Sequence, residues 1–300
     1  MTRIELGRGF ASRCAITMAA VFGALLCMTA AAYATGPTGE YAPFSDCPYE
    51  TTGVKQCVLS QSTGGEVVIG SSRAPIKNTI TLQGGSALNL ETGEEEFFAA
   101  KDGKTLSKTG QAVEGGLLDL LPKSDLPEWL WSTYEFFFEN GFTGVEAVTE
   151  LAKPASEIGI SAGNLVAEEG VALKLPVKVH LENPFLGEEC YIGSSSHPIY
   201  LSLTTGKTSP PKPNSPITGT VGELTLNGAE TILSAKGYKL VDNAFSAPEA
   251  TGCGEWWDSW AITPILNSKI GLPAASGKNT AILTGNLKRA VVSAVKKSAE

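Results

Sequence analysis

Histidine is scarce in this chain, which has only two histidines among 300 residues. The sequence also contains no G-x-S-x-G nucleophile motif, no glycine-rich loop followed by the lysine of a phosphate site, and no D-x-D-x-D-G calcium loop. Its cysteines lack the close spacing of zinc ligands. These absences argue against the hydrolase, nucleotide-binding, calcium and zinc classes that sequence motifs mark best. We therefore expect neither a cofactor nor a metal.

Positive charge is also in short supply, with 23 lysines and arginines against 31 acidic residues and a net charge of −8. A protein that binds nucleic acid or an anionic surface by charge needs a basic face. This composition does not provide one, so nucleic acid is not an expected partner. Beyond residue 34 the chain has no apolar run of the roughly 18 residues that a transmembrane helix needs. We expect no integral membrane span in the mature chain.

The N-terminus has the pattern of an export signal. Three arginines accompany an apolar run over residues 15–32, and the run ends in Ala32-Tyr33-Ala34, a small-x-small cleavage pattern. We predict a signal peptide over residues 1–34, although an uncleaved signal anchor is the alternative. Cleavage would remove three basic residues and one acidic residue, which changes the net charge from −8 to −10. The remaining domain, residues 35–300, is then secreted or extracellular, with attachment to the cell envelope left open.

Four cysteines remain after cleavage: Cys47, Cys57, Cys190 and Cys253. An even number of cysteines in an oxidising compartment predicts two disulfides. Four cysteines allow three pairings, and we favour Cys47–Cys57 with Cys190–Cys253 because these two loops do not cross. In the chain-entropy description, the short loop would stabilise the fold by about 3 kcal/mol and the long loop by about 4 kcal/mol.

Alternation of apolar and polar residues over 171–182 is the clearest secondary-structure signal. It predicts a long strand with one buried face. Pro176 has no N–H to donate, so we expect an edge strand or a bulge there. Further strands are predicted at 66–69, 76–82, 199–203, 217–226, 230–234, 238–242 and 280–284.

The expected fold is mainly β within the α+β class, an antiparallel β-sandwich-like domain with an inserted αα-hairpin. Residues 208–216 contain four prolines and predict an extended loop. Residues 255–266 suggest a short helix. The acidic run at 94–96 suggests a solvated surface turn.

The hairpin is predicted over residues 126–152. Asp125 and Pro127 mark the start of its first helix, and Thr143 with Glu146 forms a second capping box. The first helix is rich in aromatic residues and carries an acidic stripe. The hairpin either contacts a membrane or a partner, or packs over one face of the sheet. The acidic stripe favours packing, because interfacial membrane helices carry lysine and arginine instead.

A second aromatic segment holds the candidate site residues Glu255, Trp256, Trp257, Asp258 and Trp260. Tryptophan rings stack on sugars, and paired carboxylates hydrolyse glycosidic bonds. Glu255 and Asp258 would share a face of a helix, since they are three residues apart. The alternative, which we favour, is a helix whose tryptophans pack into the core.

Ser196 and His197 are the remaining candidates for nucleophilic catalysis. A serine nucleophile needs a histidine within reach and an acidic group that orients the histidine. Adjacent residues in extended chain point their side chains apart, so we do not expect this pair to act together.

Residues 181–193 read Leu-Glu-Asn-Pro-Phe-Leu-Gly-x-x-Cys-Tyr-Ile-Gly, and Pro198-Ile199 and Leu-Thr-Thr-Gly at 203–206 follow. Residues 242–254 and 279–281 belong to the same pattern. This pattern resembles a signature of secreted proteins of actinobacteria. The resemblance implies no activity and assigns no functional residue.

The sequence therefore favours a non-catalytic extracellular or cell-envelope protein with a binding or structural role, whose partner is an extracellular protein or a glycan. One alternative is a secreted carbohydrate-active hydrolase that uses Glu255 and Asp258. The other is a membrane-active or partner-inserting protein that uses the aromatic hairpin at 126–152. Whether the chain is an enzyme stays open, with the composition favouring a non-enzyme.

Overall fold

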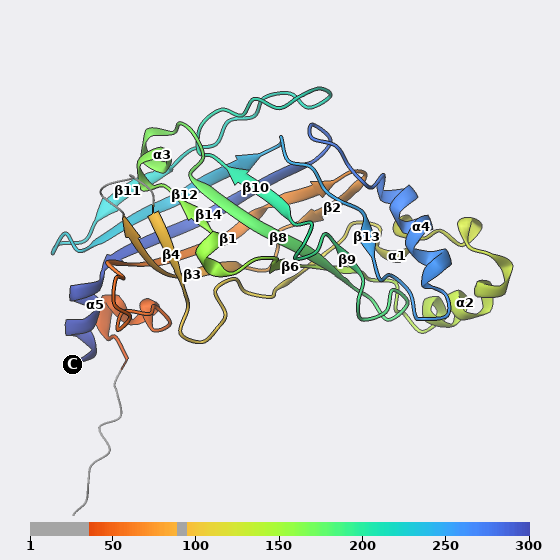
Figure 1. Ribbon diagram of the computed structural model, residues 1–300, viewed down its shortest axis with the longest axis horizontal. Coiled ribbons are helices and arrows are strands. Elements are labelled where there is room, and N and C mark those ends of the chain that lie inside the picture. The colour runs from red at the N-terminus through yellow and green to blue at the C-terminus, as the bar shows by residue number, and fades with distance from the viewer. Residues whose placement is uncertain (1–35, 89–94) are drawn as a thin grey trace, which may run out of the picture. The chain divides into compact units, whose positions relative to one another are not determined.

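The computed structural model describes residues 36–88 and 95–300, and the expected signal peptide, residues 1–34, lies outside this part of the chain. Fourteen strands of the described residues belong to one antiparallel sheet (Figure 1). The first seven are β1 (Gln56–Ile69), β2 (Ser72–Pro75), β3 (Ile80–Leu88), β4 (Glu95–Ala99), β5 (Gly110–Ala112), β6 (Glu146–Leu151) and β7 (Gly159–Ile160). The others are β8 (Leu173–Glu182), β9 (Tyr191–Ile192), β10 (Ile199–Leu203), β11 (Glu223–Leu226), β12 (Ile232–Asp242), β13 (Ala250–Thr251) and β14 (Thr280–Val291).

Helices are short and lie mainly at the two ends of the sheet (Figure 1). The α-helices are α1 (Gly116–Leu120), α2 (Trp131–Glu139), α3 (Ala162–Ala167), α4 (Ser259–Ile270) and α5 (Val292–Ala299). The 3-10 helices are η1 (Gly39–Phe44), η2 (Lys123–Asp125), η3 (Glu128–Leu130) and η4 (Ala155–Glu157). The expected helix at 255–266 corresponds to α4. Residues 208–216 form neither helix nor strand.

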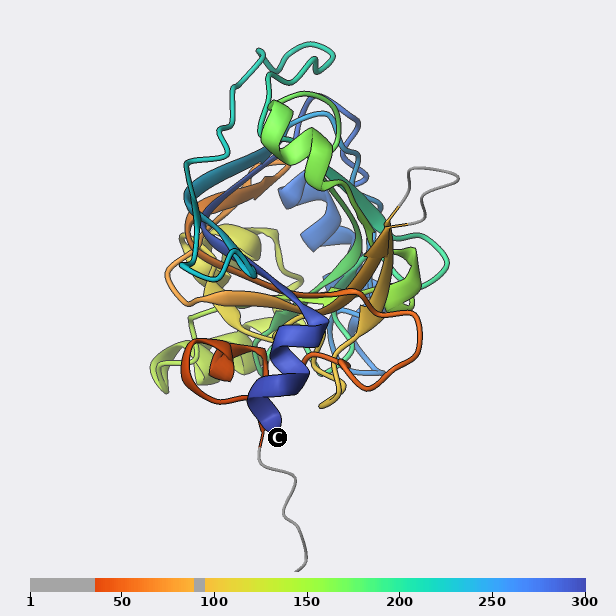
Figure 2. The same cartoon turned by 90° about the vertical axis from the view of Figure 1, so that its left-hand side faces the viewer.

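The sheet closes on itself. Its strands follow the order β12-β14-β1-β3-β4-β7-β8, and β10 pairs with β8 on the far side. Thr204, directly after β10, then exchanges two backbone hydrogen bonds with Val241 of β12, at 3.0 and 2.9 Å. Figure 2 shows the resulting ring of strands, which leaves few unpaired edges. The predicted class, mainly antiparallel β with helices, is confirmed. The strands do not divide into two facing sheets, so the sandwich arrangement is not confirmed.

The long alternating strand predicted at 171–182 is confirmed as β8, but it is not an edge strand. On one side it pairs with β10, and on the other with β7 and then β6. Ala152 donates a hydrogen bond to the Pro176 carbonyl at 3.0 Å, so the proline nitrogen faces that same side. The missing N–H therefore falls where β7 pairing ends at Lys174 and β6 pairing begins at Val177.

The interior of the closed sheet holds the main apolar core. On β10 the alternation predicted from the sequence places Ile199, Leu201 and Leu203 inside, while Tyr200 faces solvent. The Tyr238 hydroxyl is buried in this core, where it lies 2.9 Å from the hydroxyls of both Ser60 and Ser62. These bonds offset the cost of removing the phenol from water.

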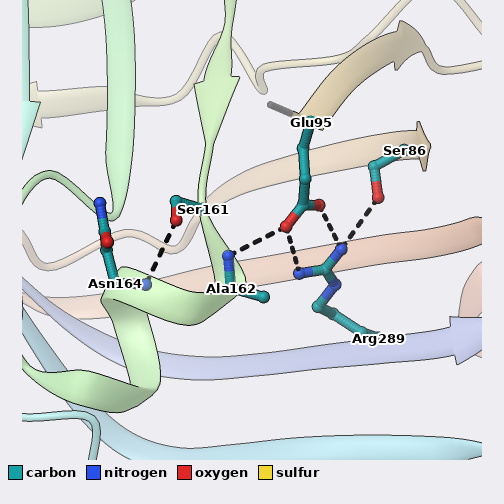
Figure 3. A network of polar contacts seen from close by, with 6 residues as sticks. All are labelled: Ser86, Glu95, Ser161, Ala162, Asn164 and Arg289. Carbon is teal, nitrogen blue, oxygen red and sulfur yellow. Dashed lines mark hydrogen bonds and ion pairs between the residues drawn. The ribbon is translucent and has the colours of Figure 1, made fainter. Parts of the chain in front are cut away.

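A buried ion pair joins strands that are distant in sequence. Arg289 of β14 binds the Glu95 carboxylate of β4 and donates to the Ser86 hydroxyl at 3.1 Å (Figure 3). Glu95 also accepts a hydrogen bond from the Ala162 N–H at the start of α3, at 2.9 Å. The prediction of a solvated acidic turn is therefore wrong for Glu95, because the arginine and α3 compensate its burial. Residue 94 lies outside the described part.

The predicted αα-hairpin at 126–152 is only half right. Its first helix is present as η3 and α2, but β6 replaces the second helix. From Glu146 to Leu151, β6 pairs residue by residue with β8. The Thr143–Glu146 spacing predicted a helix cap, yet Val148 and Thr149 are β-branched and suit a strand that has a partner. Tertiary pairing therefore overrides the local capping pattern.

A smaller core lies between η1 and α5, at the end of the sheet opposite α2 and α4 (Figure 1). The Cys47–Cys57 disulfide belongs to this core, and Thr38 binds the Ser298 carbonyl through both its N–H and its hydroxyl. The second disulfide, Cys190–Cys253, lies at the other end of the sheet. Both predicted pairings are confirmed.

Candidate functional site

All five tryptophans of the chain are exposed, and all belong to two short segments near α2 and α4. Trp256 is 89% exposed and Trp260 is 68% exposed. We define the aromatic patch as these exposed side chains and the exposed phenylalanines of α2: Trp129, Trp131, Phe136, Phe138, Trp256, Trp257 and Trp260. A buried tryptophan removes a large apolar area from water. It is therefore unusual for every tryptophan of a chain to remain exposed.

Ring contacts join the two halves of the aromatic patch. The Trp129 ring stacks on the Trp260 ring at 5.9 Å with an interplanar angle of 18°, and its centroid is 5.8 Å from that of Trp257. Trp260 Nε1 donates a hydrogen bond to the Trp257 carbonyl at 3.0 Å. Segments more than a hundred residues apart in sequence therefore form one surface at the end of the sheet where α2 and α4 lie (Figure 1).

The aromatic residues are exposed because α2 buries only one narrow face. Tyr134 is 3% exposed, and its ring packs edge-on against Phe185 at 5.5 Å. Phe137 also contacts Phe185, at 5.6 Å. Phe136 is two positions after Tyr134 and lies on the opposite side of the helix, because successive helix residues lie about 100° apart, and it is 59% exposed. Phe138 stacks on the Tyr134 ring at 6.3 Å, but its outer surface is left uncovered. The favoured packing of this helix against the fold therefore holds for Tyr134 and Phe137 but does not extend to Phe136 and Phe138.

The residues before α4 also depart from the prediction of core packing. Trp256, Trp257 and Trp260 face solvent, whereas Asp258 is only 3% exposed. Glu255 is exposed, so the two carboxyl groups do not share a face as the helical spacing predicted. Burial raises the pKa of the Asp258 carboxyl above its usual 3.8. Its Oδ1 has no hydrogen-bond partner among the described residues.

A cleft of about 980 Å³ opens beside the aromatic patch. We define the acidic cleft by the glutamates that line it: Glu146, Glu182, Glu188, Glu189 and Glu255. Phe142, which is 45% exposed and contacts Phe137 of α2 at 6.1 Å, also lines the cleft. Glu255 directly precedes Trp256. The acidic cleft and the aromatic patch are thus neighbours along two segments of the chain.

Three loops form the acidic cleft, and covalent and hydrogen bonds hold them together. The Asn183 side-chain amide donates to the carbonyls of Phe142 at 2.9 Å and Gly144 at 2.6 Å. Its oxygen accepts the Phe185 N–H at 2.8 Å. The Cys190–Cys253 disulfide and a bond from the Gly254 N–H to the Leu186 carbonyl, at 2.7 Å, tie this loop to the third.

The charge at this end of the described structure is largely uncompensated. His180 Nδ1 lies 3.2 Å from Glu182. The other four glutamates of the acidic cleft form no ion pair with any described residue. Nearby lysines are already paired: Lys123 with Glu135, and Lys269 with Asp125 at 2.7 Å. The cleft therefore presents negative charge beside apolar rings.

Ser196 and His197 are closer than predicted. A tight turn brings Ser196 Oγ within 3.0 Å of His197 Nδ1, and Ser194 Oγ within 3.0 Å of Ser196 Oγ. The expectation that the two side chains point apart is wrong because it assumed an extended chain. No carboxylate of the described residues bonds to the histidine ring, so the orienting group of a catalytic triad is missing there.

The described residues contain no group of three or more histidine, cysteine, aspartate or glutamate side chains that could hold a metal ion. None of their helices combines the length and the apolar character required to cross a membrane. No protein-family model matches this chain, and no curated protein or solved structure matches it either.

The two aromatic segments could be recognised in the sequence. That they contact each other, and that an acidic cleft lies beside them, could not. One signal could have found the cleft. Glu188 and Glu189 precede Cys190, and Glu255 follows Cys253, so the predicted disulfide alone brings three carboxylates together. The role of Asn183 in joining the loops has no local signal, since the two carbonyls that its amide group binds lie about 40 residues away.

Proposed function

We propose that this chain is a non-catalytic, secreted binding protein whose recognition surface is the aromatic patch. The observation that carries this proposal is the exposure of all five tryptophans in two distant segments, which Trp129 joins through its ring contacts with Trp257 and Trp260. Large exposed apolar patches mark interaction sites, and tryptophan dominates the residues that contribute most to binding. The two disulfides support a location outside the cytoplasm, either in the medium or at the cell envelope.

Several features support binding rather than catalysis. Glu255 is exposed whereas Asp258 is 3% exposed, which counts against a glycosidase that needs both carboxyl groups at one substrate. The Ser196–His197 contact lacks an orienting acid within the described residues. The patch is already formed, because ring stacking and the nearby disulfide hold the segments in place. A pre-formed surface loses little conformational entropy when a partner binds.

Intrinsic fluorescence tests the proposal directly, because every tryptophan lies in the aromatic patch. Protein produced from the full chain is titrated with three probes: a cationic amphipathic peptide, a soluble neutral chito-oligosaccharide and phosphatidylcholine vesicles. We expect a saturable shift of the emission with at least one probe. Trp129→Ala and Trp260→Ala should each weaken that binding about tenfold or more. The matched control Tyr200→Ala removes an exposed ring on β10 and should not change it.

Two results would overturn the proposal. One is the absence of a shift with all three probes. The other is a structural role for the tryptophans, seen as a loss of about 3 kcal/mol or more of unfolding free energy in Trp256→Ala, which is expected for a core residue and not for an exposed one. Cleavage of the oligosaccharide that disappears in Glu255→Gln would instead establish an enzyme.

A further inference from the structure

The carboxylates around the aromatic patch restrict the chemistry of its partner. Glu128 of η3 and Glu139 at the end of α2 are exposed, and neither forms an ion pair with a described residue. Glu188, Glu189 and Glu255 add three more unpaired carboxylates in the acidic cleft. A partner that covers the patch must approach these negative charges, so an anionic partner is repelled and a cationic one is attracted.

We infer that the partner is a polypeptide segment that carries both basic and large apolar side chains, with the apolar ones on the aromatic patch and the basic ones in the acidic cleft. This inference rests on the proposed function, since it names the partner of the same surface. Arginine can bind a carboxylate through two parallel hydrogen bonds, and the cleft offers several carboxylates beside apolar rings. A segment of mixed character would satisfy both surfaces at once.

The protein's own lysines show that rings at this end accept cations. Lys123 Nζ lies 4.8 Å from the ring centre of Trp131, and Lys178 Nζ lies 3.8 Å from that of Tyr191. Both distances fit an attraction between a cation and the face of an aromatic ring. A basic side chain of the partner can therefore bind at the boundary between the patch and the cleft, where carboxylates and ring faces are both present.

Neutral glycans and lipid surfaces fit these observations less well. A neutral glycan carries no positive charge that the unpaired carboxylates could attract. Anionic lipid attracts basic segments, and the unpaired charges here are acidic. The discriminating property is therefore a salt-sensitive contribution from the glutamates, which only a cationic partner produces.

The test compares a synthetic peptide of arginine and leucine with the same peptide in which glutamate replaces arginine. We expect tryptophan fluorescence to report saturable binding of the arginine peptide only, and its affinity to fall with added salt. The triple variant Glu188→Gln/Glu189→Gln/Glu255→Gln should weaken this binding about tenfold and flatten its salt dependence. The control Glu40→Gln/Glu157→Gln/Glu223→Gln makes the same change in net charge at exposed positions elsewhere.

The outcomes separate the inference from the proposed function. Equal weakening by both triple variants, or none by either, overturns the inference, because the cleft would then have no specific part in binding. Binding of the oligosaccharide or of the vesicles, without the arginine peptide, also overturns it. In these cases the loss of binding in Trp129→Ala and Trp260→Ala would still support the aromatic patch as the recognition surface.

Discussion

At the scale of single residues, substitution of Arg289 is the strongest test of how the core is stabilised. Arg289→Met leaves the Glu95 carboxylate buried without its counter-charge, and we expect a loss of about 3–5 kcal/mol in the free energy of unfolding. Urea denaturation measures this loss. The solvent-exposed Arg73 pairs with Glu66 and provides the control, since Arg73→Met should cost much less than Arg289→Met. Equal effects of the two substitutions would contradict the prediction.

A related test asks whether the loss comes from the unpaired charge. The double variant Glu95→Met/Arg289→Met removes both charges and keeps apolar volume between β4, β14 and α3. We expect it to be more stable than Arg289→Met alone, because no buried carboxylate remains to be compensated. A double variant less stable than the single one would show that packing, not charge, sets the cost.

Asp258 gives a prediction about pH. Burial raises the pKa of its carboxyl in the folded protein above 3.8, so the folded state holds this proton more tightly than the unfolded state. Its contribution to stability is therefore complete below pH 3.8, declines as the pH rises through the folded pKa, and is constant above it. Asp258→Asn should lack that decline. Thermal unfolding of both proteins across this range checks it, and a difference that does not vary with pH would contradict the prediction.

At the scale of elements, Asn183 connects the loops of the acidic cleft. Asn183→Ala leaves the Phe142 and Gly144 carbonyls and the Phe185 N–H without this partner, and should cost about 1–3 kcal/mol in unfolding free energy. It should also weaken binding of the arginine peptide, because the loops that carry the glutamates are no longer held together. Calorimetry and fluorescence titration measure the two effects.

The matched control is Asn214, whose side chain also donates to two backbone carbonyls, those of Asn243 and Asn279. Asn214→Ala should lower stability by a similar amount and leave peptide affinity unchanged. If both variants weaken binding equally, the loss follows from general destabilisation, and Asn183 has no specific role in the cleft.

Elements could be predicted from the sequence where one face of the chain is buried along its whole length. β8 has apolar residues at alternate positions and was found at its expected place. β6 was missed because Thr143 and Glu146 match a helix cap, whereas the pairing that makes the segment a strand comes from β8. The aromatic residues were expected to be buried because of the area they remove from water and, in the hairpin, because of its acidic stripe. Their exposure follows from how little of α2 the sheet can cover, which only the tertiary structure defines.

At the scale of the whole described domain, the closed sheet depends on the seam between β10 and β12. A Cβ placed on Gly219 would lie 2.4 Å from the Lys239 carbonyl oxygen and 2.7 Å from that of Thr204, so no larger side chain fits without separating them. Gly219→Val should therefore destabilise the protein by about 1–3 kcal/mol. Hydrogen exchange should show that the Thr204 and Val241 amides lose protection first.

Gly228 is the control for this substitution, because a Cβ there meets nothing within 4 Å. Gly228→Val should leave both the stability and the exchange of the seam amides nearly unchanged. If the Thr204 and Val241 amides keep their protection from exchange in Gly219→Val, the seam tolerates the valine side chain and the prediction is wrong. The sequence could not have revealed this seam, since its hydrogen bonds join residues separated by a long loop and one other strand.

The bond between Thr38 and the Ser298 carbonyl has a consequence for the order of the chain. The two residues are adjacent in space, so a short linker could join them, and new ends could be opened in the proline-rich segment at 208–216. Such a circular permutant would reach the same ring of strands from a different starting point. The helices α2 and α4, beside which the aromatic patch lies, are at the other end from this junction, so recognition would not depend on where the polypeptide begins (Figure 1).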